Sequence, residues 1–222
     1  MAGRKILLED EAKDWLGRAG IPVNPTRLCR DSEEAVACAS AFGYPVVLKV
    51  RSELALHKSE AGGVHLNITG DEAVRRSFTT LRDLVRDDPQ GGVTVQPMAP
   101  PGAELIIGVF RDAQFGPVLA FGPGGFFAEL YRDVAFRLLP LEEAAARSLF
   151  SSIRGQKLLT GFRNLPPVDT GALVRLILAV SALVEQTPNL VEMDLNPVTA
   201  YREGVLVLDA RAVLEEGSVE GS

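Results

Sequence analysis

The most informative part of the chain reads PVVLKV at residues 45–50 and continues, after a short interval, with HKSEAGGV at residues 57–64. The β-branched residues around Lys49 predict a buried strand, which would hold this ammonium group in a rigid sheet. In the second stretch, Gly62 and Gly63 allow backbone N–H groups to approach a polyphosphate closely. A fixed cation followed by a glycine loop indicates phosphate chemistry.

Three more side chains of the second stretch suit the same chemistry. Lys58 adds a positive charge, Ser59 adds a hydroxyl group, and His57 is a candidate nucleophile. The spacing matches neither GxxxxGK[ST] nor a GxGxxG at a strand-to-helix turn, so the P-loop and the dinucleotide fingerprint are excluded. A glycine-containing hairpin with solvated lysines has the same residue pattern, and this stretch alone does not decide between the two.

A second candidate site lies near the end of the chain, in VEMDLNP followed by GVLVLDA. Glu192, Asp194 and Asn196 recur every second residue, so on a strand they project from one face. A hairpin through residues 199–204 would bring Asp209 close to them, and such a set of oxygen ligands suits magnesium. A strand face with solvated acids, or a turn starting at Asn196, explains the same residues without a metal.

Blocks of sequence along nearly the whole chain resemble, in the same order, the ATP-grasp subunit or domain of ADP-forming acyl-CoA synthetases, which are related to succinyl-CoA synthetase. The blocks are GIPV (20–23), FGYPVVLKV (42–50), LHKSEAGGV (56–64), ELIIGVFRDAQFGPVLAFGPGG (104–125), ELYRDVAFRLLPL (129–141), and EMDLNPV with VLDAR. The resemblance implies an α/β (α+β) ATP-grasp fold with two lobes and a nucleotide cleft between them. It also implies a reversible reaction in which acyl-CoA, ADP and phosphate become a free acid, CoA and ATP.

The resemblance assigns roles to individual positions. Lys49 is similar to the family's phosphate-binding lysine, and His57 to a histidine that carries phosphate on this subunit. The set expected at ATP or ADP is Lys49, Lys58, Ser59, Gly62, Gly63, Gln96, Pro97, Met98 and Glu104. Within this set, residues 96–98 fall where the hinge meets the adenine edge, and Glu104 falls beside the phosphates. The implied Mg²⁺ ligands are Asp194, Asn196 and Asp209.

Two further features of the resembling blocks have open roles. Glu129 and Asp133 match an acidic pair that could orient the phosphohistidine or bind metal, and ion pairs with Arg132 or Arg137 explain them equally well. The loop at Gly122–Gly125 could approach phosphate or a partner subunit, and it is also typical of a simple hairpin turn.

Composition restricts the class of protein. The chain has 222 residues, of which 46% are hydrophobic, so it can bury a substantial core. A net charge of −6 argues against binding to nucleic acid. No apolar run is long enough for a membrane span, and the early acidic residues argue against a signal peptide, so we expect a cytoplasmic protein. Cys29 and Cys38 are too few for a disulfide framework and are expected to be reduced.

The resemblance also predicts a partner. In the family, a dinucleotide-type CoA-binding module carries the first phosphohistidine, and no such module is recognised in this sequence, so we expect a second polypeptide, a CoA-binding α subunit. Two alternatives keep the ATP-grasp fold. A stand-alone carboxylate ligase would not need His57, and a nucleotide-sensing regulatory module would bind ATP without phosphoryl exchange.

Periodicity predicts the elements that would carry these sites. Apolar stripes predict helices that end at Gly20, run from Asp31 or Ser32 to Gly43, follow a capping Asp71, and lie between Asp169 and Thr187. Strands are expected at residues 64–68, 93–96, 104–110, 117–121 and 134–139, with His65 exposed or half-buried. The three prolines of residues 97–102 predict a stiff passage between a first lobe at 1–98 and a second lobe at 99–222. Within the second lobe, the tail at 215–222 is expected to be disordered.

Overall fold

The chain forms two compact units in the computed structural model, which describes residues 3–53, 62–125, 133–161 and 166–216. The large unit comprises Met1–Leu7, Asp14–Val23 and Pro101–Ser222, and the small unit comprises Leu8–Lys13 and Asn24–Pro100. The first 23 residues are therefore shared between the units. The lobes expected at 1–98 and 99–222 stay a prediction.

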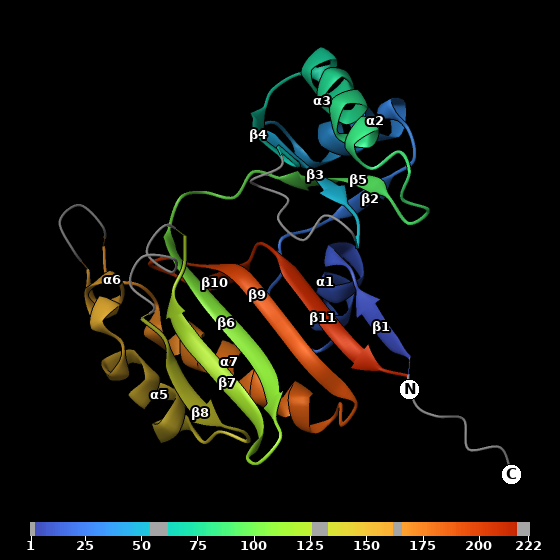
Figure 1. Ribbon diagram of the computed structural model, residues 1–222. Helices are drawn as coiled ribbons and strands as arrows, with labels where there is room; N and C mark the ends of the chain where they lie inside the picture. Colours follow the sequence, from blue (N-terminus) through green and yellow to red (C-terminus); the bar gives the residue numbers. More distant parts are fainter. Residues whose placement is uncertain (1–2, 54–61, 126–132, 162–165, 217–222) are drawn as a thin grey trace, which may run out of the picture. The chain divides into compact units, whose positions relative to one another are not determined.

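A four-stranded antiparallel sheet forms the base of the small unit. Its strands, in spatial order, are β2 (Arg27–Cys29), β5 (Gly92–Pro97), β3 (Val46–Arg51) and β4 (Val64–Ile68). Helices α2 (Ser32–Phe42) and α3 (Asp71–Leu84) pack against each other and against β5 and β3 (Figure 1). His65 pairs with Leu48 and is half-buried, as expected for its strand.

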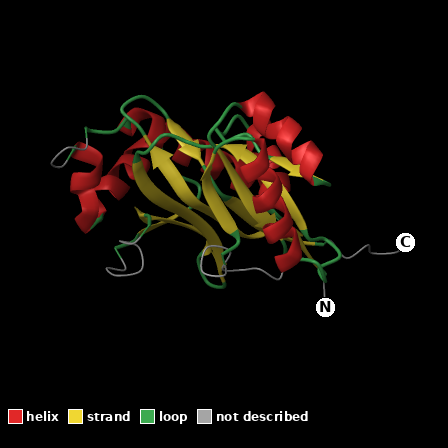
Figure 2. Ribbon diagram, turned by 90° about the horizontal axis from the view of Figure 1, so that it is seen from above, coloured by secondary structure: helices red, strands yellow, loops and turns green. Residues whose placement is uncertain are grey.

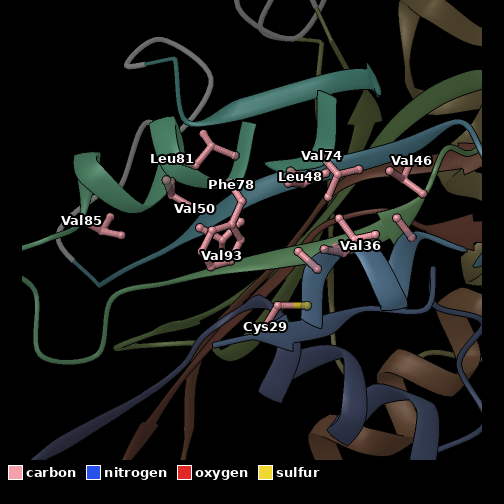
Figure 3. Close-up of a cluster of buried hydrophobic side chains, with 13 residues drawn as sticks. Cys29, Val36, Val46, Leu48, Val50, Val74, Phe78, Leu81, Val85 and Val93 are labelled. Carbon is pink, nitrogen blue, oxygen red and sulfur yellow. The ribbon is translucent and has the colours of Figure 1, made fainter. Parts of the chain in front are cut away.

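One face of this sheet carries an apolar cluster (Figure 3). Strand β3 alternates, so every second residue points into the cluster. The side chains that fill it come from both helices and three strands: Cys29, Ala35, Val36, Ala39, Val46, Leu48, Val50, Val74, Phe78, Leu81, Val85, Val93 and Val95. The stripe predicted on α3 is thereby confirmed, because all four of its apolar residues belong to the cluster. Burial on this scale contributes most of the stability of such a unit.

The predicted N-terminal cap of α2 is confirmed, whereas the one predicted for α3 is wrong. Asp31 caps α2, since its carboxylate accepts two backbone N–H groups of the first turn at 3.0 and 2.8 Å. Asp71 does not cap α3; the capping position is Gly70, and Asp71 already lies inside the first turn. The Asp71 carboxylate instead accepts a hydrogen bond of 2.8 Å from the Tyr44 hydroxyl. Its negative charge still favours the helix N-terminus.

The two thiols lie in the small unit, and both are free. Burial, reinforced by the neighbouring Cys38 thiol, raises the pKa of Cys29 to about 12. A thiol with so high a pKa stays protonated at neutral pH and reacts slowly.

The large unit is built on an antiparallel sheet of seven strands. In spatial order these are β1 (Arg4–Leu7), β11 (Ala210–Glu215), β9 (Leu190–Ala200), β6 (Ala103–Asp112), β7 (Gly116–Pro123) and β8 (Ala135–Leu138), with β10 (Val205–Val207) also pairing with β9. The helices of this part are α5 (Glu143–Ser152), the 3₁₀ turn η1 (Arg154–Gln156), α6 (Lys157–Thr160) and α7 (Thr170–Glu185). Strands are yellow and helices red in Figure 2. Helix α1 (Glu9–Arg18) contributes residues to both units.

Helix α7 matches its prediction closely. Asp169 caps it by accepting the N–H of Ala172 at 2.8 Å. Its apolar residues are buried at the expected helical spacing, namely Leu173, Leu176, Ile177, Val180 and Val184. A short turn then connects it to β9.

The ends of the chain differ from expectation. Strand β1 was not predicted, and it pairs Arg4 with Glu215 at the end of β11. Glu215 was assigned to the tail but belongs to the sheet, while residues 217–222 lie outside the described part. Among the described residues, no helix combines the length and the apolar character needed to cross a membrane.

Candidate functional site

Lys49 lies on the face of the small sheet opposite the apolar cluster. Because Leu48 and Val50 point into the cluster, the pleat turns Lys49 the other way. Its partner across the sheet is Thr94 of β5. Lys49 is only 8% exposed, and Gln96, further along β5, is only 1% exposed. A lysine this deeply buried requires a counter-charge.

That counter-charge is Glu9, at the start of α1 and within the small unit. Its Oε1 atom accepts from Lys49 Nζ at 2.7 Å, from Lys13 Nζ at 2.9 Å and from Gln96 Nε2 at 2.6 Å. Lys13 also donates to Gln96 Oε1 at 3.0 Å and to Thr26 Oγ1 at 3.0 Å. We call Glu9, Lys13, Lys49 and Gln96 the buried charge cluster.

The segment expected at the adenine edge is connected to this cluster. Gln96 uses its side chain for Glu9 and Lys13. Its neighbour Pro97 accepts Asn24 Nδ2 at 3.1 Å, and the N–H of Met98 donates to the Pro45 carbonyl at 3.0 Å. The segment is therefore held firmly inside the small unit. Its contact with adenine stays a prediction.

Only the end of the glycine loop is described. Gly62 has a φ of +69°, which favours glycine, and the Gly63 carbonyl accepts the N–H of Val50 at 2.9 Å. The loop thus closes directly beside Lys49 in the β3 strand. The other predicted residues of this stretch, His57, Lys58 and Ser59, lie outside the described residues.

The second set of predicted residues lies in the large unit, on one face of its sheet. Glu192, Asp194 and Asn196 are exposed on β9, while the residues between them, Met193 and Leu195, are buried. This alternation confirms that the three side chains share a face.

An irregularity in β9 adds two more residues to that face. Residues that pair directly across antiparallel strands have side chains on the same side, and Asp194 pairs with Gly108 while Thr199 pairs with Glu104. The register shifts between these pairs, because three steps along β9 match two along β6. The extra residue of this bulge reverses the alternation. Glu104 and Thr199 therefore face the same way as Asp194.

Asp209 joins this group at the junction of β10 and β11. Its carbonyl accepts the N–H of Asn196 at 3.2 Å, and the next residue pairs with Leu195. Partial desolvation, together with the negative charges of Asp209 and Glu192, raises the pKa of Asp194 to about 6, although Arg211 opposes the rise. Asp194 and Asp209 are thus close enough to repel each other. The structure brings together the three residues predicted as metal ligands.

The donor set of this face fits a magnesium ion. Two carboxylates that repel each other and an amide oxygen supply the hard oxygen atoms that Mg²⁺ prefers, and waters and phosphate oxygens usually complete its coordination. Within the described ranges, no group of three His, Cys, Asp or Glu side chains is arranged to hold a metal. The sequence predicts Asn196 as the third oxygen donor, beside the two carboxylates.

The glycine segment 122–125 packs against Glu104. The N–H of Gly124 donates to the Glu104 carbonyl at 2.8 Å. A Cβ atom at Gly125 would lie 2.6 Å from Glu104 Oε2, and one at Gly122 would lie 2.5 Å from the Asp133 carbonyl oxygen. Gly122 and Pro123 belong to β7 and pair with Ile106 and Leu105 of β6, so the segment continues the ladder to the Glu104 end of that strand. The approach of this segment to phosphate or to a partner subunit stays a prediction.

Asp133 has a local structural role. Its carboxylate accepts the backbone N–H groups of Arg154 at 2.7 Å and Gly155 at 2.6 Å, at the start of η1. Arg137, one of its expected partners, donates instead to the hydroxyl groups of Ser148 and Ser152. Glu129, the other member of the acidic pair, lies outside the described residues.

Sequence reasoning missed Glu9 and Lys13. The run LEDEAK shows an acidic helix start and a Glu-to-Lys spacing of four, which is typical of a solvated helix face. The available signal was the Lys49 prediction itself, because a lysine inside a buried strand implies an unseen carboxylate partner.

Comparison with known proteins gives a family match over most of the chain. A family model described as an ATP-grasp domain matches residues 1–214. The β subunit of acetate-CoA ligase [ADP-forming] I from Pyrococcus furiosus is 40% identical over 217 residues, which cover 96% of this chain and 94% of that protein.

Solved structures are similar over the same extent. The dinucleotide-forming acetyl-coenzyme A synthetase 1 of Ca. Korarchaeum cryptofilum, in complex with coenzyme A, Ca-AMPCP and HgCl+, matches with a TM-score of 0.91 and 46% identity, covering 96% of this chain and 95% of that one. A second structure of that enzyme contains coenzyme A and Mg-AMPPCP, with its phosphohistidine segment pointing towards the nucleotide binding site. It matches with a TM-score of 0.83 and 44% identity, covering 95% and 93% of the two chains.

The close packing of the glycine segment can be tested by stability. Gly122→Ala places a methyl group against the backbone oxygen of Asp133, which cannot move aside easily. We expect the free energy of unfolding to fall by about 1–3 kcal/mol in urea titrations. Gly108→Ala on the adjacent strand is the control, because its methyl group would meet Ala120 at an ordinary 3.7 Å and should change stability by less than about 0.5 kcal/mol. Equal stabilities of the two variants would contradict the packing argument.

Proposed function

Because the chain belongs to the ATP-grasp family that includes the β subunits of ADP-forming acetate-CoA ligases, we propose that it is the nucleotide-binding subunit of an ADP-forming acyl-CoA synthetase. The overall reaction converts acyl-CoA, ADP and phosphate into a free acid, CoA and ATP, and it is reversible. The observation that carries this proposal is the similarity to a β subunit over nearly the whole length of both chains.

Lys49 has the properties that a phosphate-binding lysine needs. Phosphoryl transfer depends mainly on charge neutralisation and in-line positioning, and less on covalent help from the protein. The Lys49 ammonium is nearly buried, is fixed by Glu9, and lies beside the closing end of the glycine loop. In the proposed function it neutralises charge on the nucleotide phosphates.

Asp194, Asn196 and Asp209 would hold a magnesium ion. When bound, the ion supplies charge neutralisation for the phosphate oxygens. The donor chemistry supports this assignment, because the mutual repulsion of Asp194 and Asp209 would be relieved by a divalent cation. The related Ca. Korarchaeum cryptofilum enzyme has been crystallised with Mg-AMPPCP.

His57 is the proposed carrier of phosphate on this chain. A neutral imidazole nitrogen attacks phosphorus, so a P–N bond forms while the bond from phosphorus to its previous carrier breaks. In the next step a β-phosphate oxygen of ADP attacks, the P–N bond breaks, and ATP is formed. The phosphohistidine segment of the related enzyme supports histidine chemistry in this family.

A separate partner subunit follows from the β-subunit name of the Pyrococcus relative. We propose that the partner binds CoA, forms the acyl phosphate and carries the first phosphohistidine. The phosphoryl group then passes to His57 and on to ADP. The acyl group would be recognised mainly by the partner.

The nucleotide role is tested by binding. Native chain should bind ADP with Mg²⁺ in isothermal titration calorimetry, and Lys49→Met should weaken binding about 10- to 100-fold, because a charge-assisted bond to phosphate is lost. Lys13 still neutralises Glu9 in this variant, so the fold should survive. Lys5→Met, an exposed change on β1, is the matched control and should bind as the native chain does. Failure of the native chain to bind nucleotide would refute the proposed function.

The metal ligands are tested by manganese binding followed by electron paramagnetic resonance in the presence of ADP. Asp194→Asn and Asp209→Asn should each weaken Mn²⁺ binding at least about tenfold, since each removes one anionic ligand. Glu192→Gln provides the control, because Glu192 lies on the same face but outside the proposed ligand set. If Glu192→Gln were the one variant that weakened Mn²⁺ binding, the metal site would lie nearer to Glu192 than we propose.

The histidine relay is tested by labelling the complex with its partner subunit using [γ-³²P]ATP and Mg²⁺. The native chain should acquire an acid-labile label, and His57→Ala should not, because no P–N bond can form at residue 57. The sequence offers a matched control in His65→Ala, which removes the other of the two histidines and should still be labelled. Label that persists in the His57→Ala chain would exclude this histidine as the carrier.

A further inference from the structure

The Glu9 carboxylate is the centre of the buried charge cluster. Glu9 is 2% exposed, and one of its oxygen atoms accepts hydrogen bonds from Lys49, Lys13 and Gln96. These residues come from the start of α1, from β3 and from β5, all within the small unit. Neither the sequence blocks nor the proposed reaction gives Glu9 a role.

The first turn of α1 fixes the position of this carboxylate. The N–H of Leu8 donates to Glu11 Oε2 at 3.1 Å, and the N–H of Ala12 donates to the Leu8 carbonyl at 2.7 Å. Glu11 thus supplies the half of a capping box in which a side chain accepts the N–H of the residue before the helix. A carboxylate in the first turn also interacts favourably with the helix dipole. Glu9 is consequently a rigid acceptor rather than a mobile surface acid.

Stability alone does not account for this arrangement. A buried ion pair loses most of its Coulomb energy to desolvation, and apolar residues of similar volume are often as stabilising. The opposite face of the same sheet is packed in that way, with Leu48 and Val50 inside the apolar cluster. Net stability alone is therefore a weak explanation for placing Lys49 and Glu9 on the charged face.

What Glu9 provides is control over the Lys49 side chain. A lysine has four flexible side-chain torsions, and fixing it costs up to about 2 kcal/mol of conformational entropy. The contact with Glu9 and the burial of the side chain order Lys49 during folding. The ammonium group is therefore already fixed and has lost part of its hydration before a ligand arrives. Preorganised charge of this kind is the main means by which a protein stabilises phosphoryl transfer.

We propose that Glu9 is the positioning residue of Lys49: its carboxylate holds the Lys49 ammonium at the polar face of β3, ready for a nucleotide phosphate. The inference rests on the proposed function, in which Lys49 binds that phosphate. Gln96 strengthens the arrangement, because its amide bridges Glu9 and Lys13 and so ties Lys49 to the end of β5.

The neighbouring ion pair serves as an internal comparison. Asp10 follows Glu9 in the same helical turn, and its Oδ1 atom accepts Arg51 Nε at 2.7 Å. Arg51 projects from the same face of β3 as Lys49 and is equally buried, at 8% exposed. It also donates to the Gln90 carbonyl at 2.9 Å, which is a structural contact. Asp10→Asn therefore removes the shorter of the two ion pairs that Arg51 makes with α1, leaves the one with Glu11 Oε2 at 3.3 Å, and does not touch Lys49.

The test compares ADP affinity with thermal stability in the full chain. Glu9→Gln keeps an acceptor oxygen but removes the charge that holds Lys49, so we expect ADP to bind about tenfold more weakly. Glu9→Asp keeps the charge but places it one methylene group further from Lys49, so this variant should lose less ADP affinity than Glu9→Gln. Asp10→Asn should lower the melting temperature while leaving the ADP dissociation constant unchanged.

A double variant separates positioning from a general structural effect. If Glu9 acts through Lys49, then adding Glu9→Gln to Lys49→Met should cause no further loss of ADP affinity. A further tenfold loss in that background would overturn the inference, as would native-like ADP binding by Glu9→Gln. If Glu9→Gln does not fold, Glu9→Asp takes its place in the same cycle. Native chain that fails to bind ADP at all refutes the proposed function and the inference with it, whereas the other outcomes refute the inference alone.

Discussion

A lysine that stays charged inside a sheet needs a carboxylate close to it, and this constraint organises the small unit. Strand β3 alternates between apolar residues and the cations Lys49 and Arg51. The apolar residues require helices α2 and α3 on one face, and the cations require the acidic start of α1 on the other, where Glu9 and Asp10 meet them. The period of two in a strand thus determines which elements must cover each side.

In the large unit, a single extra residue in β9 has a comparable effect. Without the bulge, Thr199 would face away from Asp194, because the two residues are an odd number of positions apart. With it, both face the side on which Glu104 and Asn196 also lie. A bulge that re-aims side chains at one end of a strand is a common device beside functional sites. Here it turns Thr199 and its partner Glu104 of β6 toward the face that carries Asp194.

The sequence predicted the local features well and the long-range partners poorly. The ATP-grasp fold and the relation to acyl-CoA synthetase β subunits are confirmed, and so are the α7 helix and the shared face of Asp194 and Asn196. These depend on residue spacing or motifs. The cap at Asp71 was wrong because the helix begins one residue earlier, and Glu9 was missed because its partners lie 40 and 87 positions away, where periodicity leaves no trace.

In the proposed function, one face of the small sheet provides stability and the other holds the phosphate-binding lysine. The apolar cluster around Leu48 and Phe78 stabilises the fold, whereas the charged face adds little net free energy, since desolvation offsets most of its Coulomb attraction. The charged face instead keeps Lys49 ordered and poorly hydrated in the folded state. In the proposed function, a phosphate group that reaches Lys49 would meet an ammonium that lost its side-chain entropy and much of its hydration during folding. The tight packing on one side of β3 is therefore what allows a costly charge to be kept on the other.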